Sequence, residues 1–278
     1  MRLRGVRKSQ NVEDRRRSGG AKGAGIGGVG LLVILAIGYF AGIDVSPLLN
    51  DMAQPQQQAT GELSAEEQKA GAFSAAVLGS TEEVWDQVFS EQLGRSYTPP
   101  VLVLFSGTTQ SPCGGASGAT GPFYCPGDRK AYLDTQFFAT LPRQLGAKGD
   151  FAAAYVIAHE VAHHVQNELG ILSKVHQARQ QSSKRDANAL TVRLELQADC
   201  LSGVWARAVD GLLEPGDLEE ALNAARMIGD DHLQKRAGRI PQPHTFTHGT
   251  SAQRSRWFKR GYDSGDVQQC DTFGAKRL

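Results

Sequence analysis

The string His159-Glu160-Val161-Ala162-His163 constrains the fold of this 278-residue chain more than any other feature, because it lies where apolar residues recur at helical spacing. Four residues at about 100° each return to nearly the same side of a helix, so the two histidines project from one face, one turn apart. They can therefore bind one metal ion, and Glu160 beside them can reach a water molecule without being a ligand. We predict a largely buried helix from Asp150 to about Gly170, whose apolar residues are Ala153, Val156, Ile157, Val161 and Val165.

The third ligand of a metal site on this helix has to come from elsewhere in the chain, because a catalytic zinc ion usually has three protein ligands and one open position. A histidine six residues after the second would supply it, but position 169 is leucine. Glu195 and Asp199 lie four residues apart on a second predicted helix, over about 186–210. Glu195 can complete the site while Asp199 accepts a hydrogen bond from a ligand histidine. The alternative is a solvated acidic face, but the apolar neighbours at 194, 196 and 198 indicate a buried helix in which an unpaired carboxylate is costly.

Four segments of the chain resemble the bacterial putative neutral zinc metallopeptidase family. They are GPFYCP (121–126), AYVIAHEVAHHVQ (154–166), ELQADCLSGVWA (195–206), and HGTSAQR with WF and G following (248–261). The similarity spans roughly 64–274 together with the N-terminal part of the chain. That family is similar in turn to the gluzincin peptidases, which carry His-Glu-x-x-His on one helix and a glutamate ligand on the next.

The resemblance implies an α+β, mainly helical zincin-like metallopeptidase domain with a small β-sheet, preceded by one transmembrane helix. It implies Zn²⁺ held by His159, His163 and Glu195, with Glu160 as the general base in the hydrolysis of a protein or peptide substrate. A different class of function stays open: a catalytically inactive, zinc-stabilised scaffold or chaperone at the membrane. The presence of Glu160 argues against that class, because a site without activity is free to lose its base.

An uncharged stretch from Gly23 to Ile43 divides the chain, since no charged residue lies between Lys22 and Asp44. Its length fits a helix across a hydrocarbon core of about 30 Å. A cleaved signal peptide is the alternative, but its apolar region would be about 7 to 15 residues long and would end in a small-residue cleavage site. We predict a basic cytoplasmic tail (1–22), a transmembrane helix (23–43), a linker (44–61) and a zinc metallopeptidase-like domain (62–278).

The basic residues of the tail decide the predicted topology. Positive charge is retained on the cytoplasmic side, so we expect a single-pass protein of the bacterial cytoplasmic membrane, with its N-terminus inside and its catalytic domain outside. The whole chain has 30 Lys and Arg against 29 Asp and Glu, a formal charge of +1. Nucleic-acid binding by the tail is the alternative, but the adjoining apolar stretch makes a topology signal the simpler explanation. The oligomeric state stays open.

Four cysteines agree with an exported domain, because an even number in that setting suggests disulfides. Cys113 and Cys125 flank a glycine-rich loop, so we predict a local bridge between them. Cys200 and Cys270 then pair by elimination. A cysteine zinc site is the competing interpretation, and it lacks the close Cys-x-x-Cys spacing.

The rest of the domain shows weaker patterns. We predict one helix from Ser64, with a capping box, to about residue 78, and a second that begins near Ser80 and ends before Tyr97. Strands are expected at 101–105 and around a turn at 126–128, with a loop over 106–121. A helix follows Pro215, and the tail from Pro241 is expected to be irregular.

A peptidase site also needs a donor for the oxyanion of the tetrahedral intermediate and an edge strand for the substrate backbone. Tyr132, His232, His248 and Arg254 are the candidate donors, and 132–135 is the candidate edge. His164 and His176 are interpreted as structural or solvent-facing. We interpret His244 and His248 as exposed loop histidines rather than a second metal pair.

Overall fold

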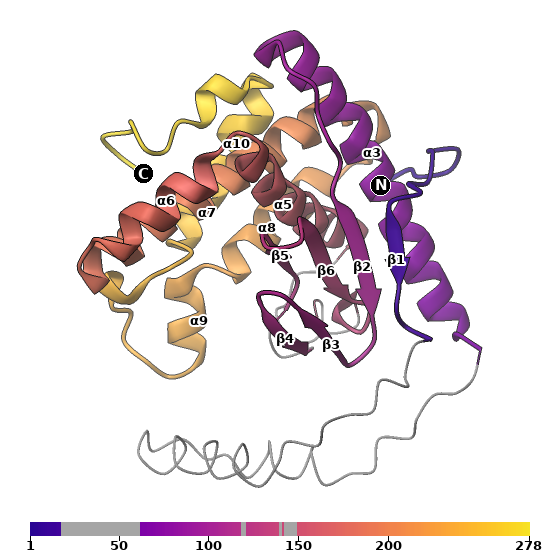
Figure 1. Ribbon diagram of the computed structural model, residues 1–278, viewed down its shortest axis with the longest axis horizontal. Helices are drawn as coiled ribbons and strands as arrows, with labels where there is room; N and C mark the ends of the chain where they lie inside the picture. Colours follow the sequence, from indigo (N-terminus) through magenta and orange to yellow (C-terminus); the bar gives the residue numbers. More distant parts are fainter. Residues whose placement is uncertain (18–61, 118–120, 139–140, 142–148) are drawn as a thin grey trace, which may run out of the picture. The chain divides into compact units, whose positions relative to one another are not determined.

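The computed structural model describes residues 1–17, 62–117, 121–138, 141 and 149–278 (Figure 1). The chain divides into two compact units, one made of Met1–Asp14 with Ser64–Leu278 and the other of Arg15–Leu63. All elements given below belong to the first unit. The predicted transmembrane helix (23–43) and linker (44–61) lie outside the described residues. Among the helices of the described ranges, none combines the length and apolar character needed to cross a bilayer.

A four-stranded sheet has the order β1-β2-β6-β5. Its strands are β1 (Val12–Asp14), β2 (Val101–Phe105), β6 (Lys130–Asp134) and β5 (Phe123–Cys125). The first three are mutually parallel, and β5 is antiparallel to β6. The strand predicted at 101–105 is confirmed as β2. Four of its five residues are buried, which explains why it is apolar at every position.

The predicted substrate edge at 132–135 is wrong, because β6 is an interior strand. Tyr132 pairs with Val103 of β2 on one side and with Phe123 of β5 on the other. The described edges of the sheet are β1 and β5. The segment predicted as a loop after β2 contains a hairpin of β3 (Thr108–Ser111) and β4 (Gly114–Ser117).

One continuous helix, α3 (Ala65–Leu93), replaces the two helices predicted there. The capping box is confirmed: the Glu67 N–H donates to Ser64 Oγ, and the Ser64 N–H donates to the Glu67 carboxylate. Ser80 and Thr81 do not start a new helix, because their hydroxyls donate to the carbonyls three residues earlier, each at 2.7 Å. Such bonds let these residues remain inside the helix.

The first fourteen residues pack into the domain, whereas the sequence predicts a separate basic tail over 1–22. Figure 1 shows this segment beside α3. The Ser9 N–H donates to the Ala75 carbonyl at 2.9 Å, and Asn11 accepts from the Leu102 N–H at 2.8 Å. The buried carboxylate of Glu82 on α3 accepts hydrogen bonds from the side chains of Arg7, Ser9 and Asn11. Because a buried carboxylate needs partners, Glu82 ties the segment to α3.

The helices stack outward from the sheet, since α5 packs on β5 and β6, α7 packs on α5, and α10 packs on α7 (Figure 1). The tail from Pro241 is not irregular throughout, because it contains α10, which Thr250 and Gln253 cap. The α-helices after the sheet are α5 (Asp150–Glu168), α6 (Ile171–Gln180), α7 (Lys184–Ala208), α8 (Asp217–Met227), α9 (Asp230–Arg236) and α10 (Ser251–Ser264). Short 3₁₀ turns are Asp210–Leu212, Pro243–Thr245 and Val267–Cys270.

Two glycines let α7 and α10 approach backbone to backbone. A β-carbon at Gly203 would lie 2.1 Å from the Phe258 carbonyl oxygen, and one at Gly261 would lie 1.8 Å from the Cys200 carbonyl oxygen. Neither position has room for a side chain.

Both predicted disulfides are confirmed, Cys113–Cys125 and Cys200–Cys270. The first joins the end of the β3–β4 hairpin to β5, and the second joins α7 to the last 3₁₀ turn of the chain.

Candidate metal centre

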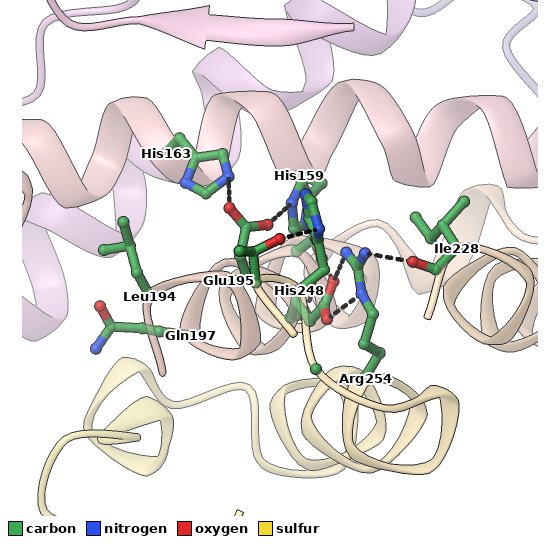
Figure 2. Close-up of polar contacts among 12 residues, drawn as sticks. His159, His163, Leu194, Glu195, Gln197, Ile228, His248 and Arg254 are labelled. Atoms are coloured by element: carbon green, nitrogen blue, oxygen red, sulfur yellow. Dashed lines mark hydrogen bonds and ion pairs between the residues drawn. The ribbon is translucent and has the colours of Figure 1, made fainter. Parts of the chain in front are cut away.

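The side chains of His159 and His163 on α5 face Glu195 on α7, as Figure 2 shows. One ligand atom from each of the three lies within 4.8 Å of the others. His159 Nε2 is 3.1 Å from one oxygen of Glu195, and His163 Nε2 is 3.5 Å from the other. The structure therefore brings together the three residues for which the sequence predicts a metal site.

Two imidazole nitrogens and one carboxylate oxygen are donors that zinc accepts. With bonds of about 2.1 Å, the corners of a tetrahedral zinc site lie about 3.4 Å apart. The separations of 3.1 and 3.5 Å, one to each oxygen of Glu195, are of that order. The residues present fit a zinc ion, and a three-residue set leaves a fourth position for water or substrate.

The charges of the cluster balance one another in the metal-free chain. Burial alone would raise the pKa of Glu195, but the two histidines outweigh it and hold that pKa well below its ordinary value. Burial alone would lower the pKa of His159, but Asp199 and Glu195 outweigh it and raise that pKa to about 9. A histidine must be neutral to bind a metal, so a metal ion and protons compete for this site.

Glu160 lies next to the cluster on α5 but is not among the three residues whose ligand atoms converge. Burial raises the pKa of its carboxyl group above the ordinary value, against the opposing effect of the two histidines. A carboxylate accepts protons more effectively when its pKa moves toward neutrality. This position and this shift suit a general base.

Asp199 supports His159 from behind, since one of its oxygens lies 3.0 Å from His159 Nδ1. The pair is close, although the ring N–H is not aligned for a hydrogen bond. Asp199 is fully buried, which excludes the alternative of a solvated acidic face. Tyr155 donates its hydroxyl to Asp199 at 2.5 Å, and Arg254 donates from Nε and Nη2, each at 2.8 Å. Burial alone would raise the pKa of Asp199, but Arg254 outweighs it and lowers that pKa.

Gln166 orients the other histidine. Its Oε1 lies 2.9 Å from His163 Nδ1, so a proton on Nδ1 leaves Nε2 free to bind a metal. Gln166 is fully buried, and its amide donates to the Leu194 carbonyl and to Gln197 Oε1. Sequence reasoning missed both Gln166 and Tyr155. Their one signal is their place in the buried helix, three residues after His163 and four before His159.

The candidate oxyanion donors occupy different environments. Tyr132 is buried and donates its hydroxyl to Asp128, so it does not serve the site. Arg254 is also buried, and its guanidinium binds Asp199, so it is not free to donate to substrate. His232 lies on α9, which packs against α8 and α10. His248 is half-exposed.

Of the remaining histidines, His164 is buried and His176 and His244 are exposed, as expected, but His244 lies in the 3₁₀ turn Pro243–Thr245 rather than in a loop. His164 is fully buried between the Tyr124 hydroxyl and the Thr98 carbonyl. His176 is exposed and contacts Gln180 on its own helix. In the described part of the chain, neither His244 nor His248 belongs to a cluster able to hold a metal.

Comparison with known proteins places this chain in a family. The model of the family described as "Putative neutral zinc metallopeptidase" matches residues 1–273. The uncharacterized protein YpfJ of Escherichia coli strain K12 is 47% identical over 285 residues, which cover 99% of each chain. The uncharacterized protein Rv2575 of Mycobacterium tuberculosis strain H37Rv is 44% identical over 216 residues, which cover 73% of this chain and 70% of its own. No solved structure matches significantly. With a family match over nearly its whole length, the chain belongs to the putative neutral zinc metallopeptidase family, whose metal is zinc.

Proposed function

We propose that the chain is a zinc-dependent peptidase that hydrolyses peptide bonds, with His159, His163 and Glu195 as metal ligands and Glu160 as the general base. One observation carries the proposal: one ligand atom from each of the three residues lies within 4.8 Å of the others, beside a carboxyl group with a raised pKa. Membership of the zinc metallopeptidase family supports the same reaction class.

Zinc, when bound, supplies a Lewis acid that polarises a carbonyl and acidifies water. A Glu160 carboxylate oxygen takes a proton from the attacking water, whose oxygen bonds to the peptide carbon. Glu160 then returns that proton to the amide nitrogen as the C–N bond breaks, which leaves a carboxylic acid and an amine. The remaining proton of the water passes from the acid to the amine, so the products are a carboxylate and an ammonium group. Gln166 and Asp199 keep the two histidine rings oriented throughout.

The test compares the purified full chain with its Glu160→Gln variant, both loaded with zinc, on an unfolded protein substrate. Loss of a general base should lower kcat/KM by about 10² to 10⁴ while the zinc content stays at one ion per chain. Glu219→Gln on the exposed face of α8 is the matched control and should keep full activity. Equal cleavage by the Glu160→Gln variant and the native chain would remove Glu160 from the mechanism.

An inactive scaffold is the second candidate, because the buried cluster joins α5 to α7 and a metal ion there would cross-link the two helices. On this alternative, zinc raises the melting temperature of the chain, but neither the native form nor Glu160→Gln cleaves any protein. Activity of the native chain that the glutamine variant lacks excludes this candidate.

We also propose that the protein is attached to the bacterial cytoplasmic membrane through residues 23–43, with its N-terminus inside and its domain outside. Two disulfides in the domain support an oxidising compartment. Reporter fusions after Leu278 test the location of the domain, and a cytoplasmic signal would overturn it. An inserted chain of this topology cannot keep β1 paired with β2, so insertion and the packing of residues 1–14 exclude each other.

A further inference from the structure

The oxyanion of a tetrahedral intermediate needs a hydrogen-bond donor placed in advance. Glu160 cannot serve, because it exchanges the proton of the water, and Tyr132 and Arg254 are engaged elsewhere. We propose that His248 is a catalytic residue that donates from Nε2 to this oxyanion. The inference rests on the proposed peptidase activity and deepens it.

The loop that carries His248 lies on the helix face that carries the cluster. Glu195 and Leu196 follow Val192 by three and four residues, and Asp199 follows Leu196 and Glu195 by three and four, so the four residues share one face of α7. A β-carbon at Gly249 would lie 3.2 Å from Leu196 Cδ2 and 3.3 Å from Val192 Cγ1. The residue next to His248 is therefore packed against the neighbours of Glu195, and Figure 2 shows the His248 side chain directed toward the cluster.

Asp230 holds this loop in place. One oxygen of its carboxylate accepts the N–H groups of Thr247 at 2.8 Å, His248 at 2.6 Å and Gly249 at 2.9 Å. The Asp230 N–H donates back to the Gly249 carbonyl at 2.9 Å. The backbone of His248 is thus fixed from both directions, which is the preorganisation that an oxyanion donor requires.

The ring of His248 is oriented by its Nδ1 side. Nδ1 lies 3.1 Å from Thr247 Oγ1 and 3.5 Å from the second oxygen of Asp230. Nε2 carries a hydrogen in two forms of the ring: the neutral form in which Nδ1 accepts from Thr247, and the charged form in which Nδ1–H faces Asp230. No partner for Nε2 is found in the described part of the chain, and 49% of the side chain is exposed, so substrate can reach it.

His248→Leu tests the proposal, with His244→Leu as the matched control on the same exposed stretch. Zinc content should not change in either variant, and His248→Leu should lower the melting temperature only slightly, because it loses the contact of Nδ1 with Asp230. Loss of one oxyanion donor costs about 10² to 10³ in kcat, so His248→Leu should lose that much activity and His244→Leu should lose none.

Inhibitor binding supplies a readout that needs no turnover. A peptide phosphonamidate mimics the tetrahedral intermediate and should bind His248→Leu at least 10-fold more weakly than the native chain. A peptide with a thiol in place of the phosphonamidate group lacks the oxygens that mimic the tetrahedral intermediate. Its affinity for His248→Leu should therefore differ from its affinity for the native chain by less than about 3-fold, on the order of measurement scatter. The inference alone is overturned if the native chain cleaves peptides and binds the phosphonamidate, but His248→Leu does both equally well. If the zinc-loaded native chain neither cleaves nor binds either peptide, the proposed function is overturned and the inference with it.

Discussion

Arg254→Met should be among the most destabilising substitutions of a residue outside the proposed ligand set. Arg254 is 1% exposed and Asp199 is fully buried, and two hydrogen bonds of 2.8 Å join them. Methionine has a similar length and leaves little cavity, so the main effect is a buried carboxylate without its guanidinium partner. Breaking a buried ion pair from one side costs about 3 to 5 kcal/mol. We expect the free energy of unfolding to fall by that amount.

A double-mutant cycle separates the pair from the packing. Asp199→Asn removes the charge that Arg254 neutralises, so Arg254→Met should cost less in that background, with a coupling of about 1.5 kcal/mol or more. The assay is urea unfolding of the metal-free chain in a chelator, followed by tryptophan fluorescence and by circular dichroism. Additive costs, or a loss below about 1 kcal/mol for Arg254→Met alone, would refute the reasoning, because both require that the ion pair is weak.

Two further predictions concern helix packing and pH. Gly261→Ala places a β-carbon against the Cys200 carbonyl and should lower the free energy of unfolding in urea by about 1 to 3 kcal/mol. Gly211→Ala is the control: its β-carbon would have no atom within 4 Å, so it should cost less than about 0.5 kcal/mol. Similar costs for both variants would contradict close packing of α7 and α10. Burial alone would raise the pKa of Asp230, but hydrogen bonds from His248 and its loop outweigh it and lower that pKa below 3.8. The stability that ionised Asp230 contributes to the fold is therefore present above pH 3.8 and is lost as the pH falls through the folded-state pKa. Asp230→Asn should thus lower the free energy of unfolding by about 1.5 to 3 kcal/mol at pH 7 and by progressively less below pH 3.8. An equal loss of stability at pH 7 and at pH 3 would count against this role of Asp230.

The helices that carry the candidate site were predictable because apolar residues recur along them at helical spacing. The apolar period from Asp150 predicts a helix to about Gly170, and α5 runs from Asp150 to Glu168. The helix predicted over 186–210 is α7, Lys184–Ala208. Helical spacing on these two elements also predicts which side chains share a face, which is why His159, His163 and Glu195 could be named together.

The helix α10 was missed because most of its residues are polar and its buried face is narrow. Buried residues on it are Arg254, Trp257, Phe258 and Gly261. A usable signal was present in the capping box of Thr250 and Gln253. Because this helix was not predicted, Arg254 was interpreted as a loop residue that could donate to substrate, whereas it is the buried partner of Asp199.

Contacts between distant segments were out of reach for local patterns. Arg254 and Asp199 are 55 residues apart, and Gln166 reaches a carbonyl 28 residues away. Strand β1 has three residues, too few to show an alternating pattern, and its pairing with β2 crosses 90 positions of the chain at Val12 and Leu102. A local pattern gave a wrong helix start at Ser80 and Thr81. Serine and threonine favour the first position of a helix, but here their hydroxyls donate to carbonyl groups within α3.

The parallel pairing of β1 with β2 links the state of the N-terminus to the stability of the whole domain. While β1 keeps its register, residues 1–14 and 64–278 share one compartment. A chain that crosses a bilayer once between them must give up this strand and leave Glu82 without Arg7, Ser9 and Asn11. By thermodynamic linkage, whatever favours crossing then weakens the domain, and whatever strengthens the docked strand opposes crossing to the same extent.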